Sequence, residues 1–228
     1  MHLFCMNTVE SFDLIIFDCD GVLVDSERIT AEVFGNVLFE ECGLSMTIPD
    51  LLRTFLGKSS KESLEIIEGL TGRKPPSTLE ARYQGEIISA LKQSVTAVCG
   101  IKQALAEITI PYCVASDGSH EKMRTTLNKA GLLKLFEGKL YSASDVQRRK
   151  PFPDIYLHAA HEMGRVAPHR CLVIEDSPVG VKGGVAAGMI VFGYAEFIKD
   201  DWLAEAGAHH VFKEMSALPG EITAYLRN

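Results

Sequence analysis

A short apolar run followed at once by two spaced aspartates limits what this chain can fold into. The run Leu14-Ile15-Ile16-Phe17 shows no alternation of polar and apolar side chains, as expected for a parallel strand covered on both faces. Asp18, Asp20 and Gly21 follow directly, and open α/β sheets bind ligands just beyond the carboxyl ends of their strands. One aspartate there can act as a nucleophile or metal ligand, and the other can transfer protons. The alternative is a plain turn, because Asp and Gly are common in loops.

Beyond Gly100, apolar strand-like runs alternate with helical stretches. This alternation predicts a Rossmann-like, doubly wound α/β core, in which helices cover both faces of a parallel sheet. Trp202 follows a charged stretch and is expected to pack in a loop. The expected strands are 111–115, 140–142, 171–174, 189–192 and 209–212, and the expected helices are 101–108, 120–130, 153–163, 179–187 and a C-terminal helix.

The segment between the first strand and Gly100 has a different pattern. Apolar residues recur at helical spacing, few strand candidates occur, and Gly43 and Gly72 are typical helix stops. We therefore expect a small α-helical cap over residues 25–95, inserted into a core formed by residues 1–24 and 96–228. Because this insert leaves and re-enters the core beside the Asp18/Asp20 loop, it is placed to act as a lid.

Composition excludes several classes of protein. The 228 residues carry a net charge of −7, which argues against a nucleic-acid binder because such proteins present a basic face. No apolar run approaches the ~18 residues of a membrane span. The six cysteines are scattered without a C-x-x-C pair, and residues 1–6 lack the basic start of a signal peptide. We expect a protein of the reducing cytoplasm that contacts neither nucleic acid nor membrane.

Polar residues also end two further predicted strands. Ser116-Asp117-Gly118 follows one strand and Glu175-Asp176 follows another, while Lys150 lies in a loop before a helix. Together with Asp18 and Asp20, the carboxylates offer hard oxygen ligands for Mg²⁺. A hydroxyl and backbone N–H groups at a helix start can hold a phosphate oxygen beside a lysine. Each cluster alone also has a structural explanation, namely a turn, a solvated loop and a helix cap.

In this order the motifs resemble those of the haloacid dehalogenase-like superfamily, in its β-phosphoglucomutase-like and 6-phosphogluconate phosphatase-like branch with a helical cap. The resemblance covers nearly the whole chain. The motifs that carry it are Asp18-Cys19-Asp20-Gly21-Val22-Leu23-Val24-Asp25-Ser26, Val114-Ala115-Ser116, Lys150-Pro151-Phe152-Pro153-Asp154 and Ile174-Glu175-Asp176-Ser177.

The resemblance implies a role for each matched residue. Asp18 is the nucleophile that becomes an aspartyl phosphate, and Asp20 protonates the leaving oxygen and then activates water. Ser116 and Lys150 hold phosphoryl oxygens, and Lys150 also offsets repulsion around Asp18. The implied Mg²⁺ ligands are Asp18, Asp20 through its backbone carbonyl, Glu175 and Asp176, and the implied substrate-binding residues are Ser116, Asp117, Gly118, Lys150 and, in the cap, Lys58.

Two positions bear on the reaction type. Dehalogenases of the superfamily carry no aspartate two residues after the nucleophile, so Asp20 disfavours dehalogenation. β-Phosphoglucomutases resemble Gly57-Lys58-Ser59-Ser60 but have arginine at the position of Ser60, which weakens the mutase alternative. We expect a Mg²⁺-dependent phosphatase for a small phosphorylated metabolite, a sugar or sugar-acid phosphate, acting as a monomer or weak homodimer. The alternatives are a sugar phosphomutase and a non-catalytic binding protein on the same fold.

Overall fold

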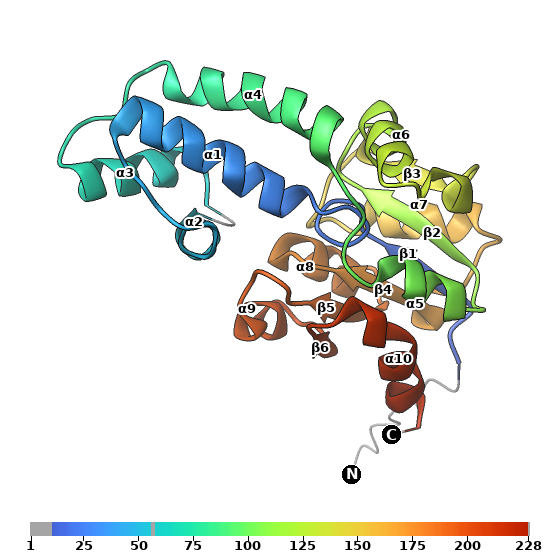
Figure 1. Ribbon diagram of the computed structural model, residues 1–228. Coiled ribbons are helices and arrows are strands. Elements are labelled where there is room, and N and C mark those ends of the chain that lie inside the picture. Colours follow the sequence, from blue (N-terminus) through green and yellow to red (C-terminus); the bar gives the residue numbers. More distant parts are fainter. Residues whose placement is uncertain (1–10, 56–57, 228) are drawn as a thin grey trace, which may run out of the picture.

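The computed structural model describes residues 11–55 and 58–227 and is built around one parallel sheet (Figure 1). Within these residues the strand order is β3-β2-β1-β4-β5-β6, and every neighbouring pair is parallel. The predicted Rossmann-like, doubly wound core is confirmed, and each expected strand overlaps an observed one. The strands are β1 (Leu14–Phe17), β2 (Tyr112–Ser116), β3 (Leu140–Ser142), β4 (Cys171–Glu175), β5 (Ile190–Tyr194) and β6 (His210–Phe212).

Helices cover both faces of the sheet because side chains alternate along each strand. Ile15 and Phe17 of β1 belong to a hydrophobic cluster with α5, α6 and α10, whereas Leu14 and Ile16 belong to a second cluster with α7, α8 and α9. These four side chains are fully buried, which explains the unbroken apolar run in the sequence. The helices are α5 (Ile101–Glu107), α6 (His120–Lys129), α7 (Asp154–Glu162), α8 (Pro178–Ala186), α9 (Asp200–Glu205) and α10 (Leu218–Leu226), with short 3-10 helices at Leu133–Phe136, Ala143–Asp145, Pro168–Arg170 and Met215–Ala217.

Helices α1 to α4 lie together beside the sheet (Figure 1) and enclose a hydrophobic cluster of their own. Val37, Leu38 and Ile67 are fully buried there. The two chain segments that connect this unit to the sheet pair with each other, since Asp25 N–H donates to the Thr96 carbonyl at 3.0 Å. The bounds are α1 (Ser26–Cys42), α2 (Ile48–Phe55), α3 (Ser60–Thr71) and α4 (Leu79–Ser94).

The structure corrects two local expectations. Trp202 lies not in a loop but in the short helix α9, half-buried against the second cluster. Six residues are too few to show helical periodicity, so the sequence pattern could not reveal this helix. Ser116 ends a strand rather than standing at a helix start, because α6 begins at His120 with Ser119 as its N-cap.

Within the described residues, no helix is long and apolar enough to cross a membrane. The expected free thiols at Cys19, Cys113 and Cys171 are found, each of them buried. The N-terminal segment 1–6, with Cys5, lies outside the described residues, as does Gly57 of the cap motif.

Candidate active site

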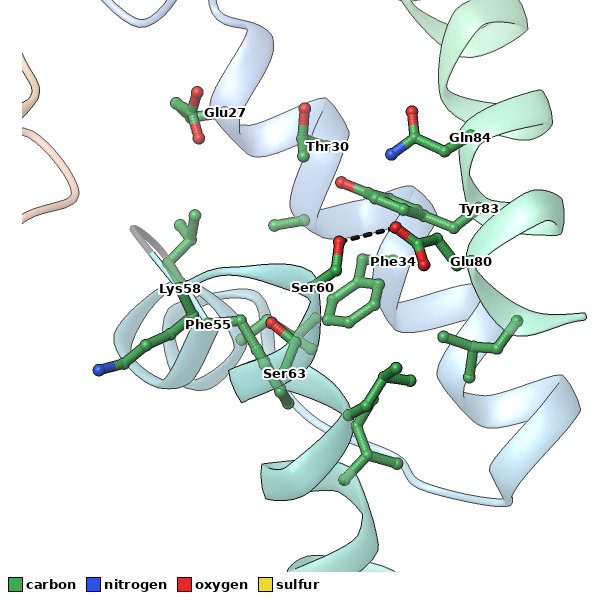
Figure 2. A pocket seen from close by; sticks show the side chains of 16 residues that line it. Glu27, Thr30, Phe34, Phe55, Lys58, Ser60, Ser63, Glu80, Tyr83 and Gln84 are labelled. Atoms are coloured by element: carbon green, nitrogen blue, oxygen red, sulfur yellow. Dashed lines mark hydrogen bonds between the residues drawn. The ribbon is translucent and has the colours of Figure 1, made fainter. Parts of the chain in front are cut away.

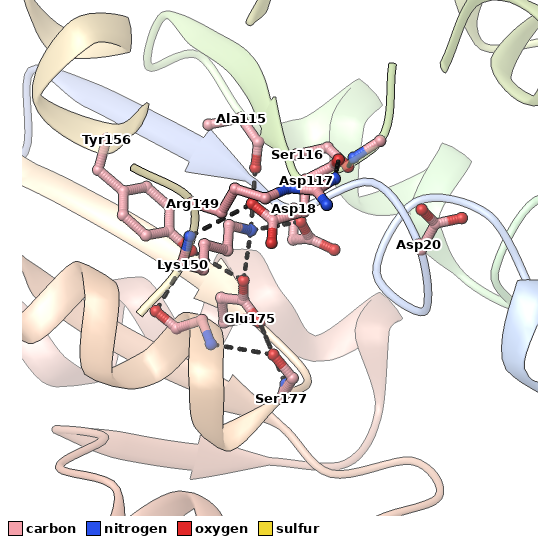
Figure 3. Close-up of polar contacts among 12 residues, drawn as sticks. Asp18, Asp20, Ala115, Ser116, Asp117, Arg149, Lys150, Tyr156, Glu175 and Ser177 are labelled. Carbon is pink, nitrogen blue, oxygen red and sulfur yellow. Dashed lines mark hydrogen bonds and ion pairs between the residues drawn. The ribbon is translucent and has the colours of Figure 1, made fainter. Parts of the chain in front are cut away.

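The predicted site residues at the strand ends converge where β2, β1 and β4 end side by side. Asp18 follows β1 directly, and its N–H donates to the Ile174 carbonyl of β4 at 3.0 Å. Ser116 and Glu175 are the last residues of β2 and β4. Parallel strands deliver their carboxyl ends to one edge of the sheet, so residues far apart in the sequence meet there. Lys150 joins them from the loop before α7 (Figure 3).

Lys150 is the centre of this cluster. Its Nζ lies 2.5 Å from Asp18 Oδ1 and 2.6 Å from Glu175 Oε1, and it donates to the Ala115 carbonyl at 3.1 Å. Only 5% of the Lys150 side chain is exposed. A lysine this deeply buried is tolerated when paired charges and hydrogen bonds replace its water. The ammonium therefore binds the nucleophile candidate and the Glu175 carboxylate together.

Burial and charge set the ionisation of these groups. Burial raises the pKa of the Asp18 carboxyl to about 7, with Glu175 adding to the rise and Lys150 opposing it. Burial also raises the pKa of Asp176 well above its usual range, and the Glu175 and Asp18 carboxylates add to that rise. Burial alone would lower the pKa of Lys150, but Asp18 and Glu175 outweigh it and hold that pKa well above its usual value. The site has more negative charge than its lysine can balance.

Glu175 is held by donors on both of its oxygens. Oε1 accepts from Lys150 and from the Tyr156 hydroxyl at 2.8 Å, while Oε2 accepts from the Ser177 N–H at 3.1 Å and the Ser177 hydroxyl at 2.9 Å (Figure 3). The backbone of α8 approaches so closely that a Cβ on Gly180 would stand 1.7 Å from Glu175 Oε1. A carboxylate has about four lone-pair sites, so Glu175 is fixed in one position.

The acidic residues fit a divalent cation. Asp18, Glu175 and Asp176 each offer an oxygen, and these oxygens lie within 4.8 Å of one another. Carboxylate oxygens are the ligands that Mg²⁺ prefers, and a cation would supply the positive charge that this buried cluster lacks. Gly21, at φ +76°, allows the Asp20 loop to approach Asp176, because a Cβ there would stand 1.9 Å from Asp176 Oδ2. Since hydrogen-bond donors already occupy both Glu175 oxygens, Asp18 and Asp176 have more oxygen lone pairs left to bind a cation.

The Asp20 carboxylate lies apart from this cluster (Figure 3). Its Oδ2 accepts from Lys122 Nζ at 2.7 Å, and its Oδ1 is buried with no hydrogen-bond partner among the described residues. The side chain of Asp20 is 23% exposed. The two aspartates of the first motif therefore have different surroundings, one beside Lys150 and the other beside Lys122.

The predicted phosphate-binding loop, residues 116–118, is held by a hydrogen bond of its own and by donors from Ser142 and Arg149. The Gly118 N–H donates to Ser116 Oγ at 3.0 Å, and the Gly118 carbonyl accepts from the Ser142 hydroxyl at 2.8 Å. The Asp117 carbonyl accepts from Arg149 at 2.6 Å. Asp18, Ser116, Asp117 and Lys150 line a pocket of about 290 Å³ at the sheet edge.

A second cavity, of about 320 Å³, lies among α1 to α4 (Figure 2). Lys58, the predicted cap residue, is exposed and lines this cavity, not the pocket that contains Lys150. Glu27 lines both the cavity and the pocket at the sheet edge, and therefore marks where the two meet. The other described lining residues are Thr30, Ala31, Phe34, Leu51, Leu52, Phe55, Ser60, Ser63, Leu64, Ile67, Leu79, Glu80, Tyr83 and Gln84.

Sequence reasoning missed three residues that the structure places at the site. Tyr156 contacts Glu175, and Lys122 contacts Asp20. Glu27 lines both the pocket at the sheet edge and the cavity among α1 to α4. Tyr156 lies in the first turn of α7, six residues after Lys150, and from there its side chain reaches Glu175 at the end of β4. No spacing rule connects Lys122 to Asp20, because their meeting depends on where α6 starts.

Comparisons with known proteins agree with this geometry. A family model described as haloacid dehalogenase-like hydrolase matches residues 15–194. The 6-phosphogluconate phosphatase of Escherichia coli (strain K12) is 34% identical over 183 residues, which is 79% of this chain and 81% of that protein. Hexitol phosphatase A of the same organism is 31% identical and is aligned over 76% of this chain and 78% of its own length.

A solved structure is also similar. It is a HAD family hydrolase from Deinococcus radiodurans R1 with bound phosphate and sodium. It is 31% identical and superimposes with a TM-score of 0.83, covering 95% of this chain and 97% of that one.

Proposed function

The chain belongs to the haloacid dehalogenase-like hydrolase family, and from that premise we propose that it is a Mg²⁺-dependent phosphatase that forms an aspartyl phosphate on Asp18. The predicted enzyme class, a hydrolase of phosphomonoesters, is confirmed by its relatives. The observation that carries the residue assignment is the contact of Lys150 Nζ with Asp18 and Glu175 at 2.5 and 2.6 Å. That contact puts a fixed positive charge beside a carboxylate at the end of the central strand.

In the first step an Asp18 oxygen attacks the phosphorus of the ester. Lys150 holds Oδ1, and Oδ2 accepts no hydrogen bond from the described residues, so Oδ2 is the attacking atom. As the new O–P bond forms, the bond from phosphorus to the leaving oxygen breaks and Asp20 gives that oxygen a proton. Ser116 and Lys150 bind phosphoryl oxygens and stabilise the charge that develops on them.

In the second step a water oxygen attacks the phosphorus of the aspartyl phosphate. Asp20, now ionised, takes the proton of that water, and the bond between Asp18 and phosphorus breaks. The products are inorganic phosphate and the restored Asp18 carboxylate. Holding one pair of carboxylates at one sheet edge lets the same Asp20 act as acid and then as base.

The metal would be held by Asp18, Asp176 and the backbone carbonyl of Asp20, with Glu175 beside them. When bound, Mg²⁺ supplies charge that offsets the repulsion between the Asp18 carboxylate and an anionic phosphoryl group. The Lys150 ammonium, which contacts Asp18, offsets the same repulsion with its own positive charge.

We propose that residues 25–95 form the cap that selects the substrate and that residues 1–24 and 96–228 form the catalytic core. Support comes from the separate hydrophobic cluster of α1 to α4 and from the cavity that this unit encloses beside the site. The cavity contains hydroxyl, amide and carboxylate groups together with aromatic rings, a lining that suits a sugar or sugar-acid moiety. Lys58 at its rim is the proposed contact for the polar end of the substrate.

The same lining does not favour a phosphomutase. A mutase needs a second phosphate site, yet the described lining residues include one cation, Lys58, and two carboxylates, Glu27 and Glu80. The Ser60 hydroxyl donates to Glu80 Oε1 at 2.7 Å, so the position where mutases have arginine contacts a negative group. Anion binding would be opposed there.

We also propose that the protein works in the cytoplasm as a monomer or weak homodimer. The free thiols at Cys19, Cys113 and Cys171 suit a reducing compartment. Size-exclusion chromatography with light scattering would measure the oligomeric state.

The residue assignment is tested by Asp18→Asn. This variant keeps the shape of the side chain and its acceptor oxygen but removes the nucleophilic carboxylate. We expect phosphate release from 4-nitrophenyl phosphate to fall by at least ~10³-fold, the scale of losing a covalent catalyst. The melting temperature, measured on the same sample, shows that the variant is folded. Turnover close to that of the wild type would exclude Asp18 as the nucleophile.

A further inference from the structure

The Asp20 carboxylate depends on a single side chain for its contacts. Within residues 11–55 and 58–227, the one donor to it is Lys122, with Nζ 2.7 Å from Oδ2. The other oxygen, Oδ1, is buried and accepts nothing. Without Lys122, both oxygens of a largely buried carboxylate would lack a partner in the described chain. Such a group would turn toward solvent or lose a defined position.

Lys122 lies beside the phosphate-binding loop, and its side chain is 42% exposed. Lys122 lies in the first turn of α6, and its N–H donates to the N-cap hydroxyl of Ser119 at 3.2 Å. Its aliphatic stem passes over Gly118, where an added Cβ would meet Lys122 Cδ at 3.4 Å and Asp20 Oδ2 at 3.7 Å. The turn that follows Ser116 therefore lies against the stem of Lys122.

A second carboxylate, that of Glu27, adds negative charge near Asp20 that the Lys122 cation can offset. The carboxylate of Glu27, in α1, forms no hydrogen bond or ion pair in the described part of the chain, and Glu27 lines the same pocket as Asp20. Burial and the nearby Asp20 charge raise the pKa of Glu27, whereas Lys122 lowers it. Like charges on Glu27 and Asp20 repel each other, and the positive charge of Lys122 attracts both carboxylates.

We propose that Lys122 is a positioning residue for the acid–base group Asp20, binding Oδ2 and so holding the carboxyl group that exchanges a proton with the leaving group. This inference rests on the proposed function and adds a residue to it. In the first step the protonated Asp20 carboxyl gives its proton to the leaving oxygen as the bond from that oxygen to phosphorus breaks. In the second step the Asp20 carboxylate takes a proton from the attacking water. Lys122 itself donates no proton in either step.

The leaving group reveals whether Lys122 acts through Asp20. An alkyl phosphate needs its leaving oxygen protonated, whereas 4-nitrophenolate leaves without a proton. The value of kcat/KM reports the steps up to departure of the alcohol, so it isolates the first proton transfer. For Lys122→Met we expect kcat/KM to fall at least ~10-fold on the best alkyl phosphate of the wild type, because positioned acid catalysis is worth about 10²–10⁴-fold in all. On 4-nitrophenyl phosphate the expected change is less than about threefold.

Two matched variants complete the experiment. Lys122→Arg keeps a cation on a long stem and is expected to recover most of the loss on the alkyl ester. Lys129→Met changes an exposed lysine of the same helix and should leave both esters unaffected. Equal losses on both esters, or no loss on the alkyl ester, would overturn the positioning role while the phosphatase function stands. A wild-type protein that hydrolyses neither ester would overturn the proposed function, and this inference with it.

Discussion

The pocket at the sheet edge and the cavity among α1 to α4 differ in how their polar groups are partnered. At the sheet edge the side chains of Lys150, Glu175 and Tyr156 are buried, and Glu175, at the end of β4, accepts hydrogen bonds from the other two. In the helical cavity most of the lining is apolar, and the exposed side chain of Lys58 forms no hydrogen bond in the described residues.

This difference assigns the two regions different tasks. Groups that stabilise a transition state must be fixed before the substrate arrives, and a buried, saturated network achieves that. A cavity with an apolar wall and a few unpartnered polar groups can instead be altered residue by residue without disturbing the chemistry. We therefore expect substitutions at the sheet edge to affect folding and turnover together, and substitutions in the cavity to affect substrate binding.

The largest effect is expected from Lys150→Met. This change leaves Asp18 and Glu175 buried without their cation, and breaking a buried pair costs about 3–5 kcal/mol of unfolding free energy. Turnover should fall with it, since Asp18, the proposed nucleophile, loses its neighbouring charge. Urea denaturation and phosphate release measure the two effects. Lys134→Met, at an exposed lysine, serves as the control.

If Lys150→Met fails to fold, Lys150→Arg provides the same test. Arginine keeps the charge but cannot place one nitrogen between Asp18 Oδ1 and Glu175 Oε1 in the space of an ammonium. A folded Lys150→Arg protein with wild-type turnover would contradict the assignment of Lys150 to the site.

A smaller effect of opposite sign in the two regions is expected from glycine to alanine changes within helices. In α8, a Cβ on Gly180 would collide with Glu175, and overpacking of this kind costs about 1–3 kcal/mol. In α4, a Cβ on Gly85 meets nothing within 4 Å. There the better helix propensity of alanine should stabilise the protein by about 0.5–1 kcal/mol.

Urea denaturation of Gly180→Ala and Gly85→Ala compares the two sites directly, and phosphate release shows whether displacing Glu175 also lowers turnover. Equal stability changes in the two variants would mean that the region around Glu175 is no more tightly packed than α4. That result would contradict the difference between the two regions.

The smallest effect is expected from Lys58→Ala in the cavity. Because Lys58 is exposed at the rim and contacts none of the reacting groups, we expect KM for the best substrate to rise several-fold while kcat changes less than about twofold. Lys61→Ala, at a side chain that is 87% exposed and does not line the cavity, is the control. A loss confined to kcat would move Lys58 from substrate binding to the chemistry.

Much of the fold could be predicted from the sequence because the strands are covered on both faces. Leu14 to Phe17 and Cys171 to Ile174 are apolar without a break, and each run ends in acidic residues. The order of the strands was not predicted, because the alternation does not determine that β1 pairs with β2 and β4. Helix α9 was not predicted because its six residues span fewer than two helical turns, too few to show a helical pattern.

The site was predictable only where its residues follow strands. Asp18, Ser116 and Glu175 stand at strand ends, so the sheet brings them together. Tyr156 and Lys122 stand on helices, and their contacts with Glu175 and Asp20 depend on helix packing that no sequence spacing encodes. Lys58 belongs to a unit whose position relative to the sheet is likewise set by tertiary contacts.

The central claim, that the sheet-edge cluster hydrolyses phosphomonoesters with the help of a divalent cation, is tested most directly by phosphate release from the wild-type protein. A panel of sugar, sugar-acid and polyol phosphates would be assayed with Mg²⁺ and again after addition of EDTA. We expect release that is strongest on one of these esters, that stops with EDTA and that returns with excess Mg²⁺. Release unaffected by EDTA, or no release from any ester by well-folded protein, would contradict the account.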